Sequence, residues 1–248
     1  MKFKTPLTLV TMAVAAVGFV SSANAAEKVY QVGSNMAFAP FEFVENGKPA
    51  GFDMELITAI MKSQGAEVQL NNIPFDGLIP ALQAGTIDIA MSGMTITEER
   101  QKRISFSEPY YDNGLVVMIR AADKDTYKSV DDLKGKTLCA QIGTTGAITV
   151  GKISGKNVKL FNNGPEAFME LANKGCEAVI HDKPVVNYYI AKRGDKGVLV
   201  LPGQLNSEKS GIAVAKNNKE LLKMVNDGLK AVKENGEYDR IYKKWFGQ

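Results

Sequence analysis

The sequence predicts an α/β protein built from two lobes of similar construction, with a ligand cleft between them. Apolar runs of strand length alternate with amphipathic runs of helix length, the order expected for largely parallel sheets covered by helices. The segments 82–93 and 171–182, LQAGTIDIAMSG and LANKGCEAVIHD, repeat one scheme of helix end, glycine, acidic residue and buried strand. Both strands end in small or polar residues, at the position where open α/β sheets bind their ligands. Two such ends facing each other would form a binding site.

The first 25 residues have the order of parts of a secretory signal peptide. Lys2 and Lys4 precede an uncharged apolar run over 7–20, and Ala23-Asn24-Ala25 is a small-x-small cleavage site. The apolar run is too short for a spanning helix with stop-transfer flanks, so an uncleaved membrane anchor is the less favoured alternative. We therefore expect a mature chain that starts near Ala26 and is free in the periplasm.

The first part of the mature chain predicts three strands and two helices. The strands are expected over residues 29–33, 68–70 and 87–91. Asp53 is the expected N-cap of the first helix, which ends at Gly65. Asp76 is the expected N-cap of the second helix, which ends at Gly85. The last strand is apolar after Asp88, as in strands that are buried on both faces.

The same alternation begins again after residue 110. Strands are expected over residues 115–119, 137–141, 158–161 and 178–180, and helical segments over 130–133 and 165–173. Gly143-Thr144-Thr145-Gly146 lies at a strand-to-helix turn. A final helix starts near Glu220, although Gly228 weakens its pattern. Trp245 is expected to anchor the chain end by packing.

Charge and composition exclude several classes of function. Without Lys2 and Lys4, 28 of the 30 basic side chains remain against 27 acidic ones, so the mature chain has no electrostatic footprint for nucleic acid or an anionic membrane. The chain has one histidine, no CxxC pair and no carboxylate cluster at ligand spacing, so we expect no metal and no cofactor. A hydrolase is disfavoured because no GxSxG nucleophile elbow is present.

Cys139 and Cys176 would enter an oxidising compartment, where a disulfide is chemically possible. Both lie in or beside runs that are predicted to be buried strands, TLCAQIG and CEAVIHD. This setting favours two small, inert, buried thiols over a bridge, but the distance between them in the fold is open.

The segment SGMTITEER at 92–100 has the residues expected of an anion site. It places Ser92, Gly93 and Thr95 in a loop at a strand end, and Arg100 one turn into the helix that follows. Free backbone N–H groups and a planar guanidinium fork together suit a carboxylate. The alternative for Arg100 is a surface ion pair with one of the nearby glutamates, which are Glu98, Glu99 and Glu108.

Two further candidate features lie in the second half of the chain. Gly143-Thr144-Thr145-Gly146 presents backbone N–H groups and two hydroxyls at a helix N-terminus, where anions are favoured. Asp182 ends an apolar strand and could hold a cation, although capping the helix that starts near Pro184 is an equally natural role. The neighbouring His181 is more typical of a hydrogen-bonded core or rim residue than of a catalytic group.

Six segments spread over the mature chain carry a family resemblance. They are GSNMAFAPFEF (33–43), GFDMELITAI (51–60), FDGLIPALQAG (75–85), SGMTITEERQKRISFSEPYY (92–111), GTTG (143–146) and IYKKWFG (241–247). Together they resemble the polar amino-acid-binding proteins of ABC importers, and most of all the glutamine-binding members. The resemblance implies a type II periplasmic binding fold, in which two α/β lobes are joined by two crossing strands. The lobes would be 26–110 with 211–248, and 115–205, with hinges near 111–114 and 206–210.

The same resemblance implies a function and partners. A receptor of this family would bind a free amino acid in the periplasm and deliver it to an ABC permease in the inner membrane. We expect it to act as a monomer and to close its lobes over the ligand.

The resemblance also implies partners for both charges of an amino acid. The residues expected here are Ser92, Gly93, Thr95, Arg100, Thr144, Thr145 and Asp182. Arg100 and the backbone N–H groups of the two loops would hold the α-carboxylate. Asp182, with the Thr95 hydroxyl and the Gly93 carbonyl, would accept the α-ammonium. A zwitterion loses its hydration on burial, so both charges need fixed partners.

The remaining expected contacts concern the side chain of the ligand. Phe38 and Phe75 would enclose its aliphatic stem, and Asn35, Gln141 and His181 would contact its polar head. Glutamine-binding relatives often carry Asp where Asn35 stands and Lys where Gln141 stands, so the head site is neutral here. Two amides match the amide of glutamine in both directions, whereas a charged head would be buried without a partner. We therefore expect glutamine, with arginine or histidine as the alternative.

The rival from another class is an enzyme on the same fold, because dehydratases acting on prephenate-like substrates also resemble this family. Such an enzyme needs a general acid inside the cleft. His181 and Asp182 are the only candidates, and Asp182 already has the α-ammonium as its expected partner. We therefore expect a receptor without catalytic residues.

Overall fold

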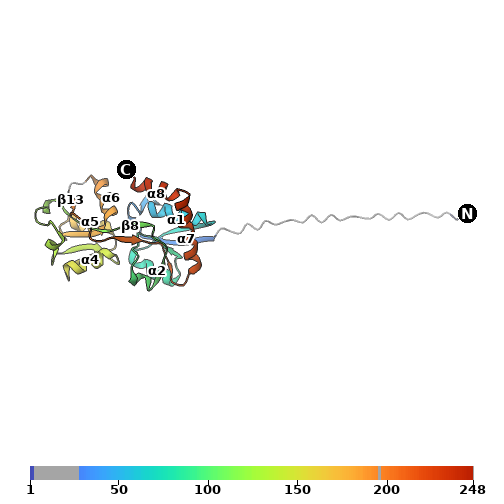
Figure 1. Cartoon of the computed structure of the whole chain (residues 1–248), viewed down its shortest axis with the longest axis horizontal. Helices are drawn as coiled ribbons and strands as arrows, with labels where there is room; N and C mark the ends of the chain where they lie inside the picture. The colour runs from blue at the N-terminus through green and yellow to red at the C-terminus, as the bar shows by residue number, and fades with distance from the viewer. Residues whose placement is uncertain (3–27, 195–196, 248) are drawn as a thin grey trace.

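The computed structural model describes residues 1–2, 28–194 and 197–247, and it has two lobes side by side (Figure 1). The predicted signal peptide and its cleavage site fall almost wholly on residues 3–27, which lie outside the described residues. Each lobe contains a five-stranded sheet with helices packed on it, as the alternating pattern predicted. Within the described residues, no helix is long and apolar enough to cross a membrane.

The first sheet has the strand order β5-β1-β6-β15-β7. Its strands are β1 (Lys28–Ser34), β5 (Ala66–Asn72), β6 (Ile89–Ala90), β7 (Ile104–Phe106) and β15 (Ala213–Ala215). β1 is parallel to β5 and β6, whereas β15 is antiparallel to β6 and β7. The strand expected over 87–91 is only two residues long in the structure, as β6. β15 comes from a distant part of the chain and pairs between β6 and β7.

The second sheet has the strand order β11-β10-β12-β9-β13. Its strands are β9 (Leu115–Arg120), β10 (Leu138–Gln141), β11 (Val158–Phe161), β12 (Ala178–Asp182) and β13 (Val198–Val200). β10 is parallel to β11 and β12, whereas β9 is antiparallel to β12 and β13. In each sheet, four of the five strands thus run in one direction, and the fourth strand in the order runs antiparallel to them. The two similar sequence segments end in β6 and β12, which hold equivalent places in this order.

Two further strands connect the sheets. β8 (Tyr111–Asn113) and β14 (Glu208–Ser210) pair antiparallel, with Glu208 opposite Asn113. Figure 1 shows β8 between the two lobes. These strands lie in the segments for which the family resemblance implies hinges. A small sheet of β2 (Ala37–Phe38), β3 (Glu42–Glu45) and β4 (Lys48–Ala50) follows β1 in the first lobe.

The helices divide between the lobes in the same way as the strands. Those of the first lobe are α1 (Phe52–Ser63), η1 (Phe75–Gly77), α2 (Leu78–Ala84), α3 (Glu98–Gln101), α7 (Lys219–Glu234) and α8 (Glu237–Phe246). Those of the second lobe are η2 (Ala121–Asp123), η3 (Val130–Leu133), α4 (Thr145–Ser154), α5 (Gly164–Ala172) and α6 (Lys183–Arg193). Figure 1 shows α7 and α8 beside α1, so the end of the chain completes the first lobe.

Two predicted helix caps are wrong. α1 begins at Phe52 with Gly51 at its N-cap, and the fully buried Asp53 lies inside the first turn. α2 begins only at Leu78, after a 3-10 turn that contains Asp76. An acidic residue before an apolar stripe has the sequence pattern of a cap, but the direction of its side chain depends on the neighbouring elements. Asp53 points to the functional site instead.

A glycine allows α7 to pack closely on α1. A Cβ atom at Gly228 would lie 2.7 Å from the backbone oxygen of Ile60, which is closer than real Cβ atoms approach. The residue that weakens the helix pattern in the sequence is therefore the one that lets the two helices touch. The buried stripe of α7 around it consists of Leu221, Val225, Leu229 and Val232.

Aromatic side chains anchor the end of the chain, as predicted for Trp245. The Trp245 ring lies edge-on to Phe43 with centroids 5.7 Å apart. The next residue, Phe246, lies 5.1 Å from the rings of both Phe41 and Phe52. Each such pair adds about 0.5–1.5 kcal/mol beyond the burial of its area. These contacts hold α8 against α1 and β3.

Cys139 and Cys176 form a disulfide, with their Cα atoms 6.1 Å apart. The sequence interpretation that favoured two free thiols is wrong. Cys139 lies in β10, and Cys176 lies just before β12, whose parallel pairing with β10 matches Leu138 with Ala178. Pairing between strands that are distant in sequence brings the two cysteines together, and local pattern carries no information about such pairing.

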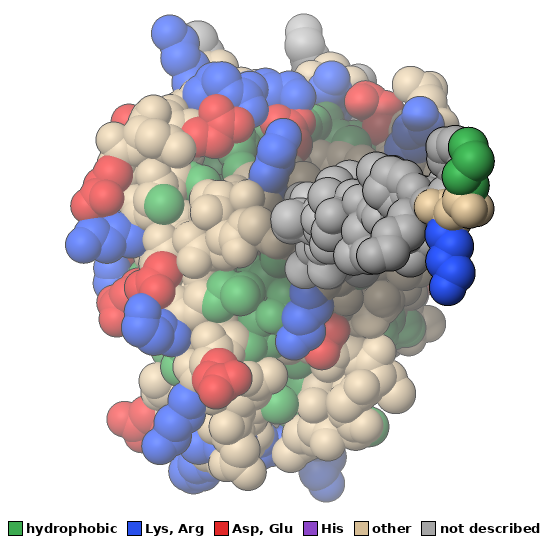
Figure 2. Space-filling model, turned by 90° about the vertical axis from the view of Figure 1, so that its right-hand side faces the viewer, with side chains coloured by type: hydrophobic (Ala, Val, Ile, Leu, Met, Phe, Trp, Pro, Cys, Tyr) green, Lys and Arg blue, Asp and Glu red, His purple; other side chains and the backbone are tan. Residues whose placement is uncertain are grey.

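Charged side chains of both signs mix on the surface of the first lobe. Figure 2 views the molecule from the side of this lobe, and Lys or Arg side chains stand among Asp and Glu side chains on the part of the face that grey atoms do not cover. Some of them pair, such as Arg240 with Glu237 at 2.8 Å. A mixed surface of this kind has no strong directed attraction for a polyanion.

Candidate functional site

A small cavity lies between the two lobes. Its lining residues are Phe38, Phe75, Ser92, Gly93, Thr95 and Arg100 from the first lobe and Gln141, Thr144, Thr145 and Asp182 from the second. All ten are among the site residues expected from the sequence. The cavity volume is only about 10 Å³, so the lobes are nearly closed on each other.

The other two expected residues, Asn35 and His181, lie next to the lining. The side-chain oxygen of Asn35 accepts a hydrogen bond from Gln141, and the His181 ring lies 5.3 Å from the Phe38 ring. The fold therefore brings all twelve expected residues to one place.

Arg100 reaches from the first lobe to the second. Its guanidinium donates hydrogen bonds to the backbone oxygens of Thr95 at 2.7 Å and Gly143 at 2.9 Å, and it lies 5.3 Å from the centre of the Phe75 ring. Burial lowers the pKa of Arg100, but a guanidinium remains protonated at neutral pH. Glu99, one of the surface glutamates considered as its partner, pairs with a lysine instead. The fork of Arg100 is thus directed into the cleft.

The Gly143–Gly146 segment begins a helix at the edge of the cavity, as predicted. Thr144 is the N-cap of α4, because its hydroxyl oxygen accepts from the backbone N–H of Ala147 at 3.1 Å. The same hydroxyl donates to the backbone oxygen of Gln141 at 2.7 Å. The Thr144 hydroxyl therefore makes both of these hydrogen bonds with the backbone of its own loop and helix. The backbone N–H groups of the first turn are the donors that remain for an anion at this helix end.

Asp182 ends β12 and lines the cavity from the second lobe. It occupies the N-cap position of α6, but its side chain makes no capping bond, so the alternative role considered for it is not formed. The amide of Asn113 in β8 donates to its Oδ1. Burial raises the pKa of Asp182 to about 7, and the carboxylate of Glu208 acts in the same direction. A cation in the cavity would favour the ionised form.

His181 forms part of the cavity wall. The backbone N–H of Asp182 donates to its Nδ1 at 2.8 Å, so the neutral ring carries its hydrogen on Nε2. Burial lowers the pKa of His181 to about 4, which keeps the ring neutral at neutral pH. The ring packs between Phe38 and Phe168, with centroids 5.3 and 5.1 Å away. Its Nε2 has no hydrogen-bond partner among the described residues, and it faces Gly164, where an added Cβ atom would lie 2.4 Å from it.

Two buried acidic residues hold the Ser92–Gly93 loop, and neither was expected at the site. Glu42 accepts a hydrogen bond from the Ser92 hydroxyl at 2.6 Å. Asp53 accepts from the backbone N–H of Gly93 at 2.9 Å and from the Tyr110 hydroxyl at 2.7 Å. The only sequence signal for them is that both lie in segments carrying the family resemblance. Their burial depends on β3 and α1 packing behind the loop.

Burial raises the pKa of both acids, that of Glu42 well above its usual range and that of Asp53 to about 6. Each carboxyl has one oxygen without a partner among the described residues, Oε2 of Glu42 and Oδ1 of Asp53. Two buried acids side by side cannot both ionise readily. Burial thus disfavours ionisation of both acids together, and the pair supports the loop from behind.

The Ser92–Gly93 loop can approach the cavity only because of its glycine. Gly93 has a φ angle of 54°, in the left-handed region that side chains rarely adopt. A Cβ atom there would lie 2.7 Å from the Phe38 ring. Glycine thus places the backbone of this loop directly against an aromatic wall of the cavity.

The two amides expected at the ligand head meet across the cleft. Nε2 of Gln141 donates to Oδ1 of Asn35 at 3.0 Å and to the backbone oxygen of Asn162 at 3.1 Å. The backbone N–H of Asn35 donates to the Ser92 hydroxyl at 3.0 Å. Within the described structure these amides are buried and their hydrogen-bond partners are uncharged. This end of the site is neutral, as the sequence predicted.

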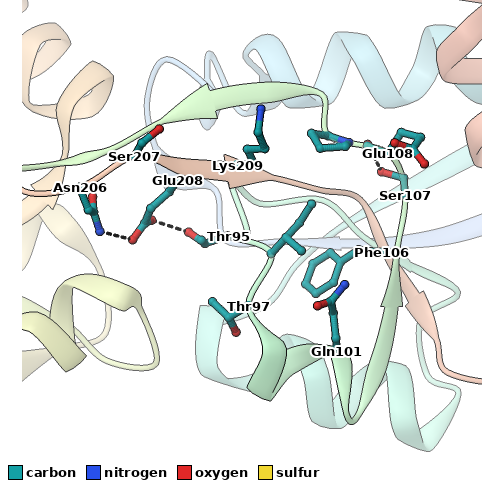
Figure 3. Close-up of a pocket in the computed structure, with 12 residues that line it drawn as sticks. Thr95, Thr97, Gln101, Phe106, Ser107, Glu108, Asn206, Ser207, Glu208 and Lys209 are labelled. Carbon is teal, nitrogen blue, oxygen red and sulfur yellow. Dashed lines mark hydrogen bonds between the residues drawn. The ribbon is translucent and has the colours of Figure 1, made fainter.

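Glu208 in β14 is a further carboxyl group of the site that sequence reasoning missed. Its Oε2 accepts hydrogen bonds from the hydroxyls of Thr95 at 2.7 Å and Thr145 at 2.9 Å, one from each lobe. Its Oε1 accepts from Asn206 at 2.8 Å (Figure 3). In the sequence Glu208 lies in the polar run NSEKS, which has no sign of burial, and the expected hinge at 206–210 was the only signal.

No group of three or more His, Cys, Asp or Glu side chains in the described ranges is arranged to hold a metal ion. The chemistry of the cavity is therefore that of its hydrogen-bonding and charged side chains, with two aromatic walls.

Comparisons with known proteins agree with this architecture. A family model described as bacterial extracellular solute-binding proteins, family 3, matches residues 30–248. The chain is 39% identical over 228 residues to a probable histidine-binding protein of Neisseria gonorrhoeae, covering 89% of this chain and 84% of the relative. It is 38% identical over 236 residues to the ABC transporter arginine-binding protein 1 of Escherichia coli strain K12, covering 93% and 95%. A solved structure of an ancestral arginine-binding protein bound to glutamine is similar with a TM-score of 0.85, at 43% identity, over 90% of this chain and 99% of that one.

Proposed function

The chain belongs to family 3 of the bacterial extracellular solute-binding proteins, and we propose that it binds one free polar L-amino acid in the cleft between its lobes. The observation that carries this proposal is the presence of Arg100 and Asp182 around one cavity. Arg100 belongs to the first lobe and Asp182 to the second, so opposite charges meet the cavity from different lobes. An α-carboxylate and an α-ammonium fit these partners, and enclosure by the lobes strengthens both interactions.

Entry of an amino acid requires the lobes to separate. The contact between Gln141 and Asn35 and the contact between Arg100 and Gly143 both cross the cleft. We take the opening bodies to be the lobes 26–110 with 211–248, and 115–205. Hinge motion at 111–114 and 206–210 would open the cleft, because the strands that connect the two sheets, β8 and β14, lie in these segments.

A receptor of this kind works outside the cytoplasm and together with a transporter. The family is named for extracellular proteins, and the relative from Escherichia coli is named as an arginine-binding protein of an ABC transporter. The proposal is therefore a monomeric periplasmic receptor that passes its amino acid to an ABC permease in the inner membrane.

The rival function is a dehydratase on the same fold, which would need a general acid beside its substrate. Asp182 has a raised pKa, but it lies where the α-ammonium needs an acceptor. His181 is neutral and uses Nδ1 as an acceptor. The named relatives are binding proteins, which supports a receptor without catalytic residues. Incubation with prephenate or arogenate tests this directly, and release of product would favour the enzyme.

L-Glutamine is the first candidate for the ligand. Its side-chain amide carries two donors and an acceptor, and the amides of Gln141 and Asn35 offer the complementary groups when they separate. A neutral ligand head leaves no unpaired charge in this part of the cleft.

L-Arginine is the second candidate, and the buried carboxyls favour it. Glu42, Asp53, Asp182 and Glu208 surround the site, whereas Arg100 is the only cation that lines the cavity among the described residues. Glu42 lies behind Ser92, which in turn accepts from the backbone of Asn35, so the acidic pair of Glu42 and Asp53 stands close to the head site. A guanidinium would be attracted by this excess of acids.

The ligand is decided by binding measurements on protein that has been unfolded and refolded to remove any bound amino acid. A thermal-shift screen of the twenty common amino acids identifies ligands, because a molecule bound only by the folded state raises the melting temperature. Calorimetry then ranks L-glutamine, L-arginine and L-histidine. Glutamine ranked first supports the first candidate, and arginine ranked first selects the second. A screen without any shift contradicts the receptor proposal itself.

A further inference from the structure

Thr95 and Thr145 bring a hydroxyl to the cavity from each lobe, and both hydroxyls donate to the same oxygen of Glu208. The distances from Thr95 Oγ1 and Thr145 Oγ1 to Glu208 Oε2 are 2.7 and 2.9 Å. The amide of Asn206 donates to the other oxygen at 2.8 Å. Figure 3 shows Glu208 between Asn206 and Thr95 on the strand that crosses from one lobe to the other. Three donors thus converge on one carboxylate.

Glu208 is buried on a strand that connects the two lobes. It belongs to β14, where it lies opposite Asn113 of β8, and Asn113 donates to Asp182. The Glu208 side chain is only 8% exposed. The charged groups that interact with it are Asp182 and Arg100, which line the same cavity. Glu208 is therefore part of the hinge and is also coupled to the site.

A hydroxyl group has one hydrogen and two lone pairs, and it can turn to present either. An ionised carboxylate only accepts hydrogen bonds, so it determines which way a neighbouring hydroxyl turns. The hydrogens of Thr95 and Thr145 both point to Glu208. The lone pairs of Thr95, which lines the cavity, are then left to accept from a cation.

We propose that Glu208 is a positioning residue that orients the Thr95 and Thr145 hydroxyls, so that the cavity offers acceptors to the α-ammonium group of the ligand. The inference rests on the proposed amino-acid-binding function and deepens it. Glu208 acts through Thr95 and does not need to touch the ligand. Glu208 also joins a threonine of each lobe to β14 by a hydrogen bond. Both hydroxyls are therefore oriented only when the lobes are closed.

The substitution Glu208→Gln tests this inference because it keeps the shape and changes the direction of the hydrogen bonds. A glutamine amide at this position can donate to a threonine oxygen, and the hydroxyl hydrogen then turns toward the cavity. Glu108→Gln is the matched control, because Glu108 is exposed and lines the same surface groove as Glu208. Circular dichroism and thermal melting establish that each variant is folded.

The measurement compares ligands with and without the α-amino group. The pairs are L-glutamine with 4-carbamoylbutanoate, and L-arginine with 5-guanidinopentanoate, each measured by calorimetry or by displacement. In Glu208→Gln the amino acid is expected to bind at least tenfold more weakly, whereas the desamino analogue changes less than twofold. The control is expected to change neither. A purely structural role of Glu208 would weaken both members of a pair equally.

Equal weakening of both members, or no change of either, overturns the inference and leaves the proposed function intact. Failure of all twenty amino acids of the thermal-shift screen to bind the unmodified protein overturns the proposed function, and the inference with it. If Glu208→Gln does not fold, Glu208→Asp replaces it. That shorter acid keeps the charge but cannot reach both hydroxyls, so the same selective loss is expected, and an unchanged preference for the amino acid overturns the inference.

Discussion

The side-chain amide of Gln141 in the second lobe donates a hydrogen bond to the side-chain oxygen of Asn35 in the first, at 3.0 Å. This contact joins the carboxyl end of β10 to the loop after β1 across the ligand cleft. The bond gives a partner to one N–H of the Gln141 amide and to the side-chain oxygen of Asn35, both of which are buried. If the proposed ligand head lies here, it would replace this bond with two of its own, so groups that both donate and accept would suit this place.

Arg100→Ala is expected to weaken amino-acid binding at least a hundredfold without unfolding the protein. Removal of one partner of a buried charge pair costs about 3–5 kcal/mol, and each 1.4 kcal/mol is roughly tenfold in affinity. Calorimetry on the folded variant measures the loss. Arg103→Ala is the matched control, because Arg103 is exposed and donates to Gln83 on the surface. Near-native binding by Arg100→Ala would show that the carboxylate partner is misassigned.

Asn35→Asp is expected to improve the binding of arginine or lysine relative to glutamine. The change adds a negative charge to a head site whose present hydrogen-bond partners are uncharged amides and backbone. A carboxylate there would pair with a guanidinium or an ammonium. Competition between labelled glutamine and each rival, in the variant and the unmodified protein, gives the ratio. An unchanged ratio would mean that the ligand head lies elsewhere in the cavity.

Amino-acid binding near neutral pH is expected to release a proton from Asp182. Burial raises the pKa of Asp182 to about 7 in the absence of a cation, and an α-ammonium beside it favours the ionised form. Because the ligand needs the carboxylate, affinity is expected to fall, by up to about tenfold per pH unit, as the pH drops below 7. Calorimetry at pH 7 in two buffers of different ionisation enthalpy counts the proton.

Asp182→Asn separates this effect from that of the nearby buried acids, because burial also raises the pKa of Glu42 and raises that of Asp53 to about 6. The variant is expected to bind more weakly and to release no proton at pH 7. Proton release that persists in Asp182→Asn would assign it to the Glu42–Asp53 pair instead.

Lobe closure is expected to make the molecule more compact when the ligand binds. Phe38, Phe75 and Arg100 belong to the first lobe, whereas Thr145 and Asp182 belong to the second, so one ligand would touch both. Small-angle scattering should show a smaller radius of gyration in saturated protein than in protein freed of ligand. Samples that bind the amino acid but keep the same radius would contradict closure on a shared site.

Removal of the disulfide is expected to lower stability without changing the ligand. The bridge between Cys139 and Cys176 closes a loop with a sequence separation of 37, and such bridges stabilise by about 2–4 kcal/mol. Replacement of both cysteines by alanine should therefore lower the melting temperature while the order of ligand affinities stays the same. An unchanged melting temperature under reducing and oxidising conditions would show that the bridge contributes little.

Much of the fold was predictable because its signals are local. Alternating apolar runs predicted β1, β10 and β12, and the glycine-threonine turn predicted the start of α4. The repeated scheme over 82–93 and 171–182 predicted two lobes whose strand ends face one site, and the sheets indeed share one strand order. The family motifs implied a type II periplasmic binding fold, which the family match and the similar solved structure confirm.

The sequence by itself therefore predicted most of the elements and the family, because periodicity and motifs record what each short segment must do. Its family resemblance also predicted twelve site residues, which the fold brings together at the cleft. Tertiary structure alone decided the burial of Glu42, Asp53 and Glu208 and the joining of the two cysteines. Glu208 reaches Thr95 across a sequence separation of 113, and no local pattern distinguishes such a buried acid from a solvated one. Whether a carboxyl orients a hydroxyl, shares a proton or faces water depends on which distant strands and helices pack around it.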